Sequence, residues 1–174
     1  MTKAEIQQQL IERHRTFAQA ILSLSEDNFL FAQPDKWTAG QQLEHIYRSV
    51  APVKLAFSLP KFISPLLFGK ANRASKNYED LVSKYQGKLA AGGKAPAPFI
   101  PKPVAFNTQN QLKDKLLRTI NALNRSVNKY AESELDLYIL PHPLLGKLTL
   151  REMLYFTMYH VEHHHKAVSQ SLNK

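Results

Sequence analysis

The chain contains no cysteine among its 174 residues. This absence excludes disulfide bonds, thiolate zinc sites, iron–sulfur clusters and cysteine nucleophiles, so any bound metal must rest on nitrogen and oxygen ligands. Long apolar runs are also missing, because the most apolar stretch, residues 62–68, includes Ser64 and Pro65 and is too short to span a bilayer. The first residues lack the apolar region of a secretory signal, so we expect a cytoplasmic protein.

Acidic residues are scarce in the middle of the chain. The formal net charge is +9, and residues 61–129 hold thirteen basic residues against three acidic ones, so all of the excess lies there. One interpretation is a solvated face that aids solubility. The other is a surface for an anionic partner, such as nucleic acid, a phospholipid surface or an anionic substrate. Aromatic residues in this segment suit base stacking, but they fit a core or a dimer contact equally well, and we recognise no nucleic-acid motif.

Four segments begin with the same helix-start signal, a threonine followed three residues later by Glu or Gln. Such a pair can form a capping box, in which each side chain binds a backbone N–H of the other residue. The pairs are Thr2/Glu5, Thr38/Gln41, Thr108/Gln111 and Thr149/Glu152. Apolar residues at helical spacing follow each pair and predict four helices, over about 3–24, from 39 onward, over about 109–131 and over about 150–172. No segment shows convincing strand alternation.

These patterns predict an all-α protein, a four-helix bundle formed by a single domain over residues 1–174. A long insert, about residues 61–107, separates the second helix from the third. Its middle, residues 78–91, favours a further helix, whereas residues 91–103 contain two glycines and four prolines and favour turns and extended chain. A crossover of this length allows the second and third helices to run parallel. We expect residues 140–147 to form a rigid loop.

Histidines gather near the end of the chain, where residues 160–165 hold four of the seven. Residues four apart lie on one face of a helix, so His160 and His164 can reach the same ion. Both fall on one flank of the apolar stripe of the last helix, roughly 100° and 60° from its centre. The same helical geometry predicts that His163 faces solvent and that His165 packs inward. Neutral imidazole is a common ligand of zinc, nickel, copper and iron.

Two imidazoles do not complete a site, and His45 on the second helix is the best candidate for a third ligand. It lies off the apolar stripe of that helix, with Gln42 and Ser49 one turn to either side. The alternative is a histidine-rich, partly exposed last helix and an unrelated surface His45. His14 and His142 are expected to be structural or exposed.

Two segments resemble motifs of the DinB/YfiT-like superfamily. They are Lys36-Trp37-Thr38-Ala39-Gly40-Gln41-Gln42-Leu43-Glu44-His45 and the run from His142 through Thr149 and Glu152 to His160-Val161-Glu162-His163-His164. The resemblance extends over essentially the whole chain. It implies a four-helix bundle in which His45, His160 and His164 bind a divalent metal, usually nickel or zinc, with water or a substrate group completing the shell. It also makes a homodimer plausible, and Trp37 is expected to be a structural anchor at the entrance to the second helix.

Three functions remain open. The resemblance favours a metal-dependent enzyme, either a hydrolase or a transferase of low-molecular-weight thiols, since the superfamily includes bacillithiol- and mycothiol-dependent enzymes. The substrate would then be a small molecule, with or without a thiol cosubstrate. A general base is not evident, because helical geometry points Glu44 and Glu162 away from the ion. The second function is a non-enzymatic metal-binding stress-response protein, and the third is an anionic-surface or nucleic-acid binder through residues 61–129.

Overall fold

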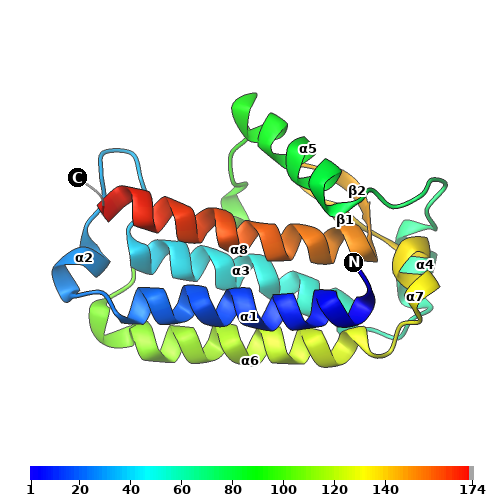
Figure 1. Cartoon of the computed structure of the whole chain (residues 1–174), viewed down its shortest axis with the longest axis horizontal. Helices are drawn as coiled ribbons and strands as arrows, with labels where there is room; N and C mark the ends of the chain where they lie inside the picture. The colour runs from blue at the N-terminus through cyan, green and yellow to red at the C-terminus, as the bar shows by residue number, and fades with distance from the viewer. Residues whose placement is uncertain (173–174) are drawn as a thin grey trace.

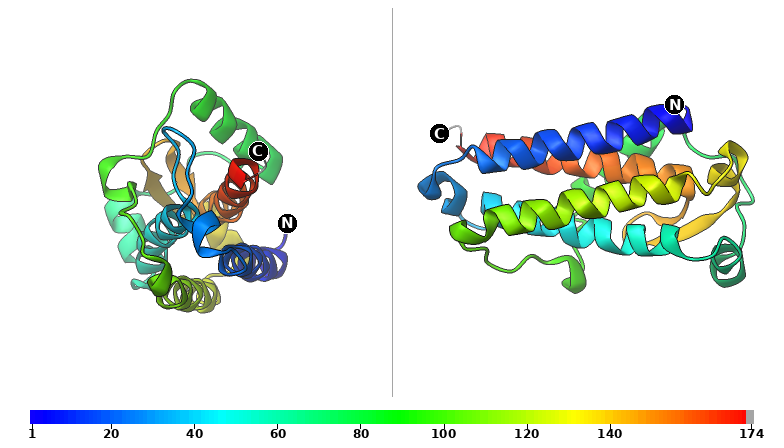
Figure 2. Two further views of the ribbon diagram at one scale, coloured as in Figure 1. Left: turned by 90° about the vertical axis from the view of Figure 1, so that its left-hand side faces the viewer. Right: turned by 90° about the horizontal axis from the view of Figure 1, so that it is seen from below.

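The computed structural model describes residues 1–172 and is mainly helical, which confirms the predicted all-α class. Four long helices lie side by side: α1 (Lys3–Leu22), α3 (Ala39–Ser58), α6 (Gln109–Val127) and α8 (Leu150–Leu172). Figure 1 shows that α1 and α8 run in one direction and that α3 and α6 run in the other. The end-on view in Figure 2 shows α1, α3, α6 and α8 surrounding one common interior. The second and third long helices therefore run parallel, as the length of the crossover allows.

Three of the four predicted capping boxes are present. Thr2 and Thr38 cap α1 and α3 with reciprocal bonds to Glu5 and Gln41. At the start of α8, the backbone N–H of Thr149 donates to Glu152, whose own N–H donates to the Thr149 hydroxyl. The box at Thr108 is wrong, because the chain enters α6 through a short 3₁₀ turn, η2 (Phe106–Thr108). Thr108 is already helical, and its hydroxyl donates to the Ala105 carbonyl at 2.7 Å.

The interior is formed by the apolar stripes that the helical spacing predicts. Each long helix turns one row of side chains inward, where burial of apolar surface supplies the main driving force for folding. The buried residues include Ile6, Leu10, Phe17 and Ile21 from α1, Ile46, Val50, Val53 and Phe57 from α3, Leu116, Ile120, Leu123 and Val127 from α6, and Leu150, Leu154, Val161 and Val168 from α8.

A two-stranded hairpin contradicts the expectation that the chain has no strand and that residues 140–147 are a loop. Strands β1 (Ile139–His142) and β2 (Gly146–Thr149) pair antiparallel, with Ile139 opposite Thr149 and His142 opposite Gly146. Gly146 has a φ of 78°, a conformation that glycine adopts without strain, directly after the turn. Strands of four residues, one of them containing proline, are too short to show a clear alternation, which is why the sequence pattern missed them.

The remaining elements are short and lie mostly in the insert and the connections. They are α2 (Glu26–Leu30), α4 (Ile63–Phe68), α5 (Tyr78–Ala90), the 3₁₀ turn η1 (Ala97–Phe99) and α7 (Glu132–Leu137). Helix α5 confirms the helix predicted in the insert and lies across the outside of α8 (Figure 1). The proline-rich connector contains η1, a turn that the sequence analysis did not predict, and η1 packs against α3. The insert and the hairpin therefore flank the same side of α3 and α8 (Figure 2).

A buried carboxylate joins the insert to the start of α8. The Glu152 side chain is fully buried and accepts hydrogen bonds from the Arg73 guanidinium at 2.6 and 2.8 Å and from the backbone N–H of Lys76 at 2.8 Å. Burial alone raises the pKa of Glu152, but these donors outweigh it and hold the pKa below its ordinary value. Among residues 1–172, no helix is both long and apolar enough to cross a membrane.

Candidate metal centre

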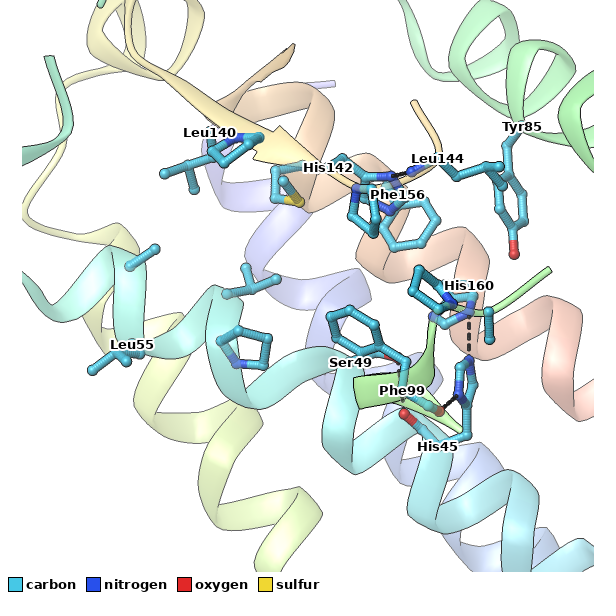
Figure 3. A pocket seen from close by; sticks show the side chains of 18 of the residues that line it. His45, Ser49, Leu55, Tyr85, Phe99, Leu140, His142, Leu144, Phe156 and His160 are labelled. Carbon is cyan, nitrogen blue, oxygen red and sulfur yellow. Dashed lines mark hydrogen bonds between the residues drawn. The ribbon is translucent and has the colours of Figure 1, made fainter. Parts of the chain in front are cut away.

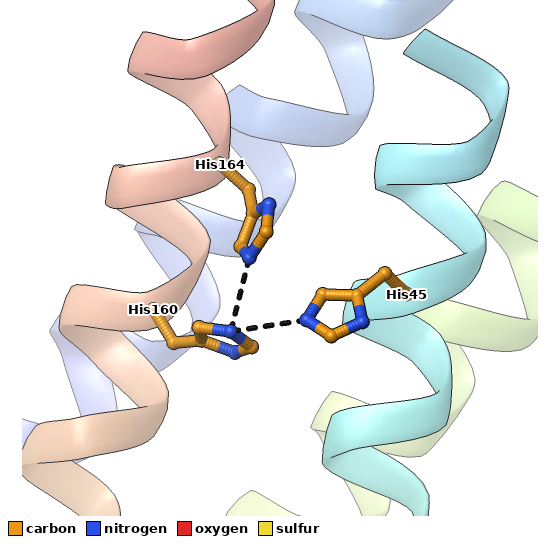
Figure 4. Close-up of side chains that lie close together, drawn as sticks. All are labelled: His45, His160 and His164. Carbon is orange, nitrogen blue, oxygen red and sulfur yellow. Dashed lines mark hydrogen bonds between the residues drawn. The ribbon is translucent and has the colours of Figure 1, made fainter. Parts of the chain in front are cut away.

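Three imidazoles from two helices converge at one point between α3 and α8 (Figure 4). The Nε2 atom of His160 lies 3.2 Å from Nε2 of His45 and 3.0 Å from Nε2 of His164. His45, His160 and His164 are 4, 6 and 7% exposed, so the sequence-based alternative of an exposed surface His45 is wrong. Helical spacing brings His160 and His164 together, and the antiparallel packing of α3 against α8 brings His45 to them.

Two oxygen atoms outside the cluster fix the orientation of two of the rings. Nδ1 of His45 lies 2.7 Å from the Phe99 carbonyl oxygen, and Nδ1 of His164 makes a short contact with Oε1 of Gln42. Since both oxygens are acceptors, each Nδ1 carries the proton and donates it. The Nε2 atoms of His45 and His164 are then unprotonated and turn their lone pairs toward His160. This arrangement is the one by which proteins usually orient metal-ligating histidines.

The spacing of the nitrogen atoms fits a divalent ion. Tetrahedral ligands at a zinc–nitrogen distance of about 2.05 Å lie about 3.3 Å apart, close to the 3.2 and 3.0 Å between the Nε2 atoms. The ligand atoms of all three histidines lie within 4.8 Å of one another. Within residues 1–172, no carboxylate or fourth imidazole joins this group. A cation held here would therefore keep at least one position for a ligand from solution.

Burial keeps the three imidazoles neutral. It lowers the pKa of His160 and of His164 well below the usual value, and the neighbouring histidines lower both further. Burial also lowers the pKa of His45, partly offset by the hydrogen bond to Phe99. A neutral imidazole offers the lone pair that a metal ion requires.

Aromatic rings enclose the cluster. The Trp37 ring stacks on His164 with centroids 6.1 Å apart and lies 4.8 Å from the ring of His45. The Phe156 ring stacks on His160 at 4.8 Å, and the Tyr85 ring meets His160 edge-on at 6.1 Å. Trp37, which the sequence predicted to be an anchor at the entrance to α3, forms one wall of the site. These rings keep the imidazoles in a site of low polarity, where electrostatic interactions are stronger than in water.

A cavity of about 450 Å³ opens beside the three imidazoles. Figure 3 shows His45 and His160 at one end, with Leu55 and Leu140 at the other. The proline-rich connector forms part of its wall through Lys94, Ala95, Pro96 and Phe99. The connector therefore closes part of one side of this cavity.

Several groups near the cluster were missed or misplaced by sequence reasoning. His163 was expected to face solvent but is half-buried, lines the cavity and packs against the ring of Tyr85, with centroids 6.0 Å apart. His142 also lines the cavity, and its Nδ1 accepts from the backbone N–H groups of Leu144 and Leu145 at 3.1 and 3.0 Å. Burial and nearby Lys84 lower the pKa of His142 to about 4.

The remaining predictions concern residues that lie away from the cluster. His14 is a structural residue, completely buried inside α1, with Nδ1 2.7 Å from the Leu10 carbonyl oxygen. Glu44 binds Arg48 and Glu162 binds Arg13, so neither carboxylate belongs to the metal-ligand group. Neither Glu44 nor Glu162, the two carboxylates next to the histidine ligands in sequence, is therefore placed as a general base at this site.

The architecture and the site together define a class: a helical protein whose antiparallel long helices bring three buried histidines together beside an apolar cavity. Within that class, the chain belongs to the DinB superfamily, whose family model matches residues 9–168. This match confirms the resemblance drawn from the motifs around His45 and His160. A search of curated proteins finds no match to the chain.

Proposed function

We propose that this protein is a metal-dependent enzyme of the DinB type, in which the four long helices form the family's four-helix bundle and His45, His160 and His164 hold a divalent ion. The observation that carries the proposal is the convergence of three Nε2 atoms, with His160 3.2 Å from His45 and 3.0 Å from His164, and with no carboxylate or fourth imidazole joining them within residues 1–172. Structural zinc sites usually have four protein ligands, whereas catalytic sites have three and leave a position open.

The donor set favours zinc or nickel, because imidazole nitrogen suits both and the absence of cysteine removes softer ligands. When bound, such an ion supplies Lewis acidity, which lowers the pKa of a water or thiol ligand and polarises a substrate oxygen. Three neutral imidazoles leave the positive charge of the ion undiminished. The reaction proposed is therefore hydrolysis, or transfer of a low-molecular-weight thiol to an electrophile.

The protein's own side chains bind, orient and shield the reacting groups. Gln42 and Phe99 hold two of the imidazoles in orientation, while Trp37 and Phe156 exclude water from two sides of the cluster. Tyr85 lines the cavity next to His160, and its hydroxyl makes no hydrogen bond to any residue from 1 to 172. Burial raises the pKa of Tyr85 to about 12. Its hydroxyl thus stays protonated near neutral pH and is free to donate to a substrate oxygen.

The test measures two reactions of metal-loaded protein, release of an alcohol from an activated ester and consumption of a thiol in the presence of an aromatic electrophile. We expect one of them to be accelerated by the wild-type protein and to fall to the background rate in His160→Ala. The matched control is His165→Ala, since His165 lies on the same helix outside the cluster. Equal rates in wild type and His160→Ala would reject metal-dependent catalysis and leave a non-enzymatic metal-binding protein.

A further inference from the structure

The cavity beside the imidazoles is an apolar channel that follows one face of α3. Its lining includes His45, Ser49, Pro52, Ala56 and Leu59, positions spaced so that they fall on one side of the helix. At a rise of 1.5 Å per residue, the eleven steps from His45 to Ala56 correspond to roughly 16 Å. The channel thus reaches well beyond the space that a water molecule or a small polar substrate would need.

The walls of this channel away from the histidines are almost entirely apolar. They are formed by Val53, Leu55, Ala56, Leu59, Leu67, Phe68, Leu89, Leu140 and Met153 together with several prolines. The hydroxyl of Ser49 is already used, since it donates to the His45 carbonyl at 2.8 Å. Among residues 1–172, Lys94 is the one lysine or arginine in the lining, and no carboxylate takes part in it. A sugar- or peptide-based thiol would lose its hydration here without gaining hydrogen bonds, which is unfavourable.

The far end of the channel carries apolar side chains that are exposed. Leu55 and Leu67 are 60 and 63% exposed, and both line the cavity. Large apolar side chains gathered at an opening commonly mark a binding site, because their exposure is otherwise unfavourable. Tyr85 and two of the proposed metal ligands, His45 and His160, lie at the other end (Figure 3).

We infer that the substrate is an amphiphile, with an oxygen- or sulfur-containing head at the three-histidine end and an apolar tail along α3 as far as Ala56 and Leu67. This inference rests on the proposed function, since it takes the histidine end as the reactive end. The inference assigns the apolar channel to the tail of the substrate and not to a polar thiol cosubstrate. Residues Ala56 and Leu67 then set the length of tail that is accepted.

The experiment measures the dissociation constants of butano-, hexano- and octanohydroxamate by calorimetry, with zinc-loaded wild-type protein. The hydroxamate head is a metal ligand, and burying one methylene contributes about fourfold in affinity. We expect affinity to rise about threefold or more per methylene, giving octanohydroxamate, which is four methylenes longer, an advantage of at least about 80-fold over butanohydroxamate. Affinity that is independent of chain length would overturn the inference.

Two variants and a control test whether the apolar tail of the probe occupies the channel. Ala56→Trp fills the channel far from the imidazoles, and Leu67→Asp puts a charge at its exposed end without disturbing the core. Both should abolish most of the chain-length dependence and leave bound zinc and butanohydroxamate affinity unchanged. Arg118→Trp, at an exposed position on α6 outside the lining, should behave as wild type. If chain-length dependence persisted in both channel variants, the assignment of the tail to this channel would be wrong.

The same titrations in protein stripped of metal separate this inference from the proposed function. If the three histidines hold no metal, zinc loading leaves all affinities unchanged, and the chain-length dependence still appears because it depends on the apolar walls. If the metal site is correct and the channel assignment is wrong, zinc strengthens all three probes equally and chain length has no effect.

Discussion

Gln42 and His164 lie 122 positions apart in the chain, yet the side-chain oxygen of Gln42 accepts a hydrogen bond from Nδ1 of His164. The bond joins α3 to α8 directly behind the proposed metal ligand, and both side chains are buried. Because the bond fixes which nitrogen of His164 carries the proton, Gln42 acts as a positioning residue for the site.

The first prediction concerns this bond. Replacing Gln42 by Leu removes the acceptor and leaves the protonated Nδ1 without a partner, so we expect metal affinity to fall about 10- to 100-fold. Competition with a chelator of known affinity measures the change. Gln41→Leu is unsuitable as a control because Gln41 caps α3, so Gln86→Leu, on α5, serves instead. Unchanged affinity in Gln42→Leu would show that the bond does not orient the ligand.

A second prediction concerns Tyr85, which lines the cavity and whose hydroxyl makes no hydrogen bond to any group among residues 1–172. Tyr85→Phe keeps the ring against His160 and removes the donor, so we expect kcat to fall about tenfold, the equivalent of one lost hydrogen bond. Bound metal should be unchanged, and steady-state kinetics with metal analysis checks both. Tyr159→Phe, which removes a hydroxyl bonded to Gln86 at 2.7 Å outside the cavity lining, is the matched control. A loss of metal in Tyr85→Phe would show a structural role only.

The third prediction concerns the buried His14, for which burial lowers the pKa to about 4. The pKa in the unfolded chain is about 6.5. Above that pH the imidazole is neutral in both states. As the pH falls toward 4, the unfolded chain binds a proton that the folded protein does not, so the free energy of unfolding decreases by roughly 3 kcal/mol.

The variant His14→Leu should lose this part of the acid sensitivity. Urea unfolding at several pH values between 7.5 and 4 measures the free energy of unfolding of each protein. Metal-free protein is used because protons compete with a metal ion for the ligand histidines, which would add a second pH dependence. We expect the stability of the variant relative to wild type to rise as the pH falls. A constant difference across that range would contradict the assignment of a depressed pKa to His14.

A fourth prediction concerns the ion pair between Arg73 and Glu152. Breaking a buried pair by removing one partner typically costs about 3–5 kcal/mol, but Arg73 is 39% exposed and backbone N–H groups still bind the carboxylate. We therefore expect Arg73→Met to lower the free energy of unfolding by only about 1–2 kcal/mol. Thermal or urea unfolding measures the change, with Arg125→Met on α6 as a surface control. A loss as small as that of the control would show that the pair does not stabilise the insert.

Much of the fold was accessible from local sequence patterns. The stripes of α1, α3, α6 and α8 follow from helical periodicity, and the boxes at Thr2, Thr38 and Thr149 mark true helix starts. The capping box predicted at Thr108 is absent because such a box forms only where the helix begins. The 3₁₀ turn η2 starts the helical backbone earlier than the pattern indicated. The sequence pattern missed the hairpin because its four-residue strands are stabilised by pairing and by contact with α8. A local pattern records neither of these interactions.

The candidate site shows the same division. The positions of His160 and His164 on one flank of α8 follow from the spacing of four. Gln42 had a detectable signal, because it lies one turn before His45 on the same face of α3. Phe99, Tyr85 and His142 had none, since they reach the site only when the insert and the hairpin fold against α3 and α8. The placement of His163 was wrong because the helical wheel took no account of α5, which covers that side of α8.

The most direct test of the central claim is the metal content of purified, tag-free protein measured by elemental analysis, alongside His45→Ala and His165→Ala. If His45, His160 and His164 form the site, wild type and His165→Ala will each carry close to one zinc or nickel ion per chain, and folded His45→Ala will have lost it. Equal metal in His45→Ala and wild type, or none in any of the three after exposure to zinc and nickel, would contradict it.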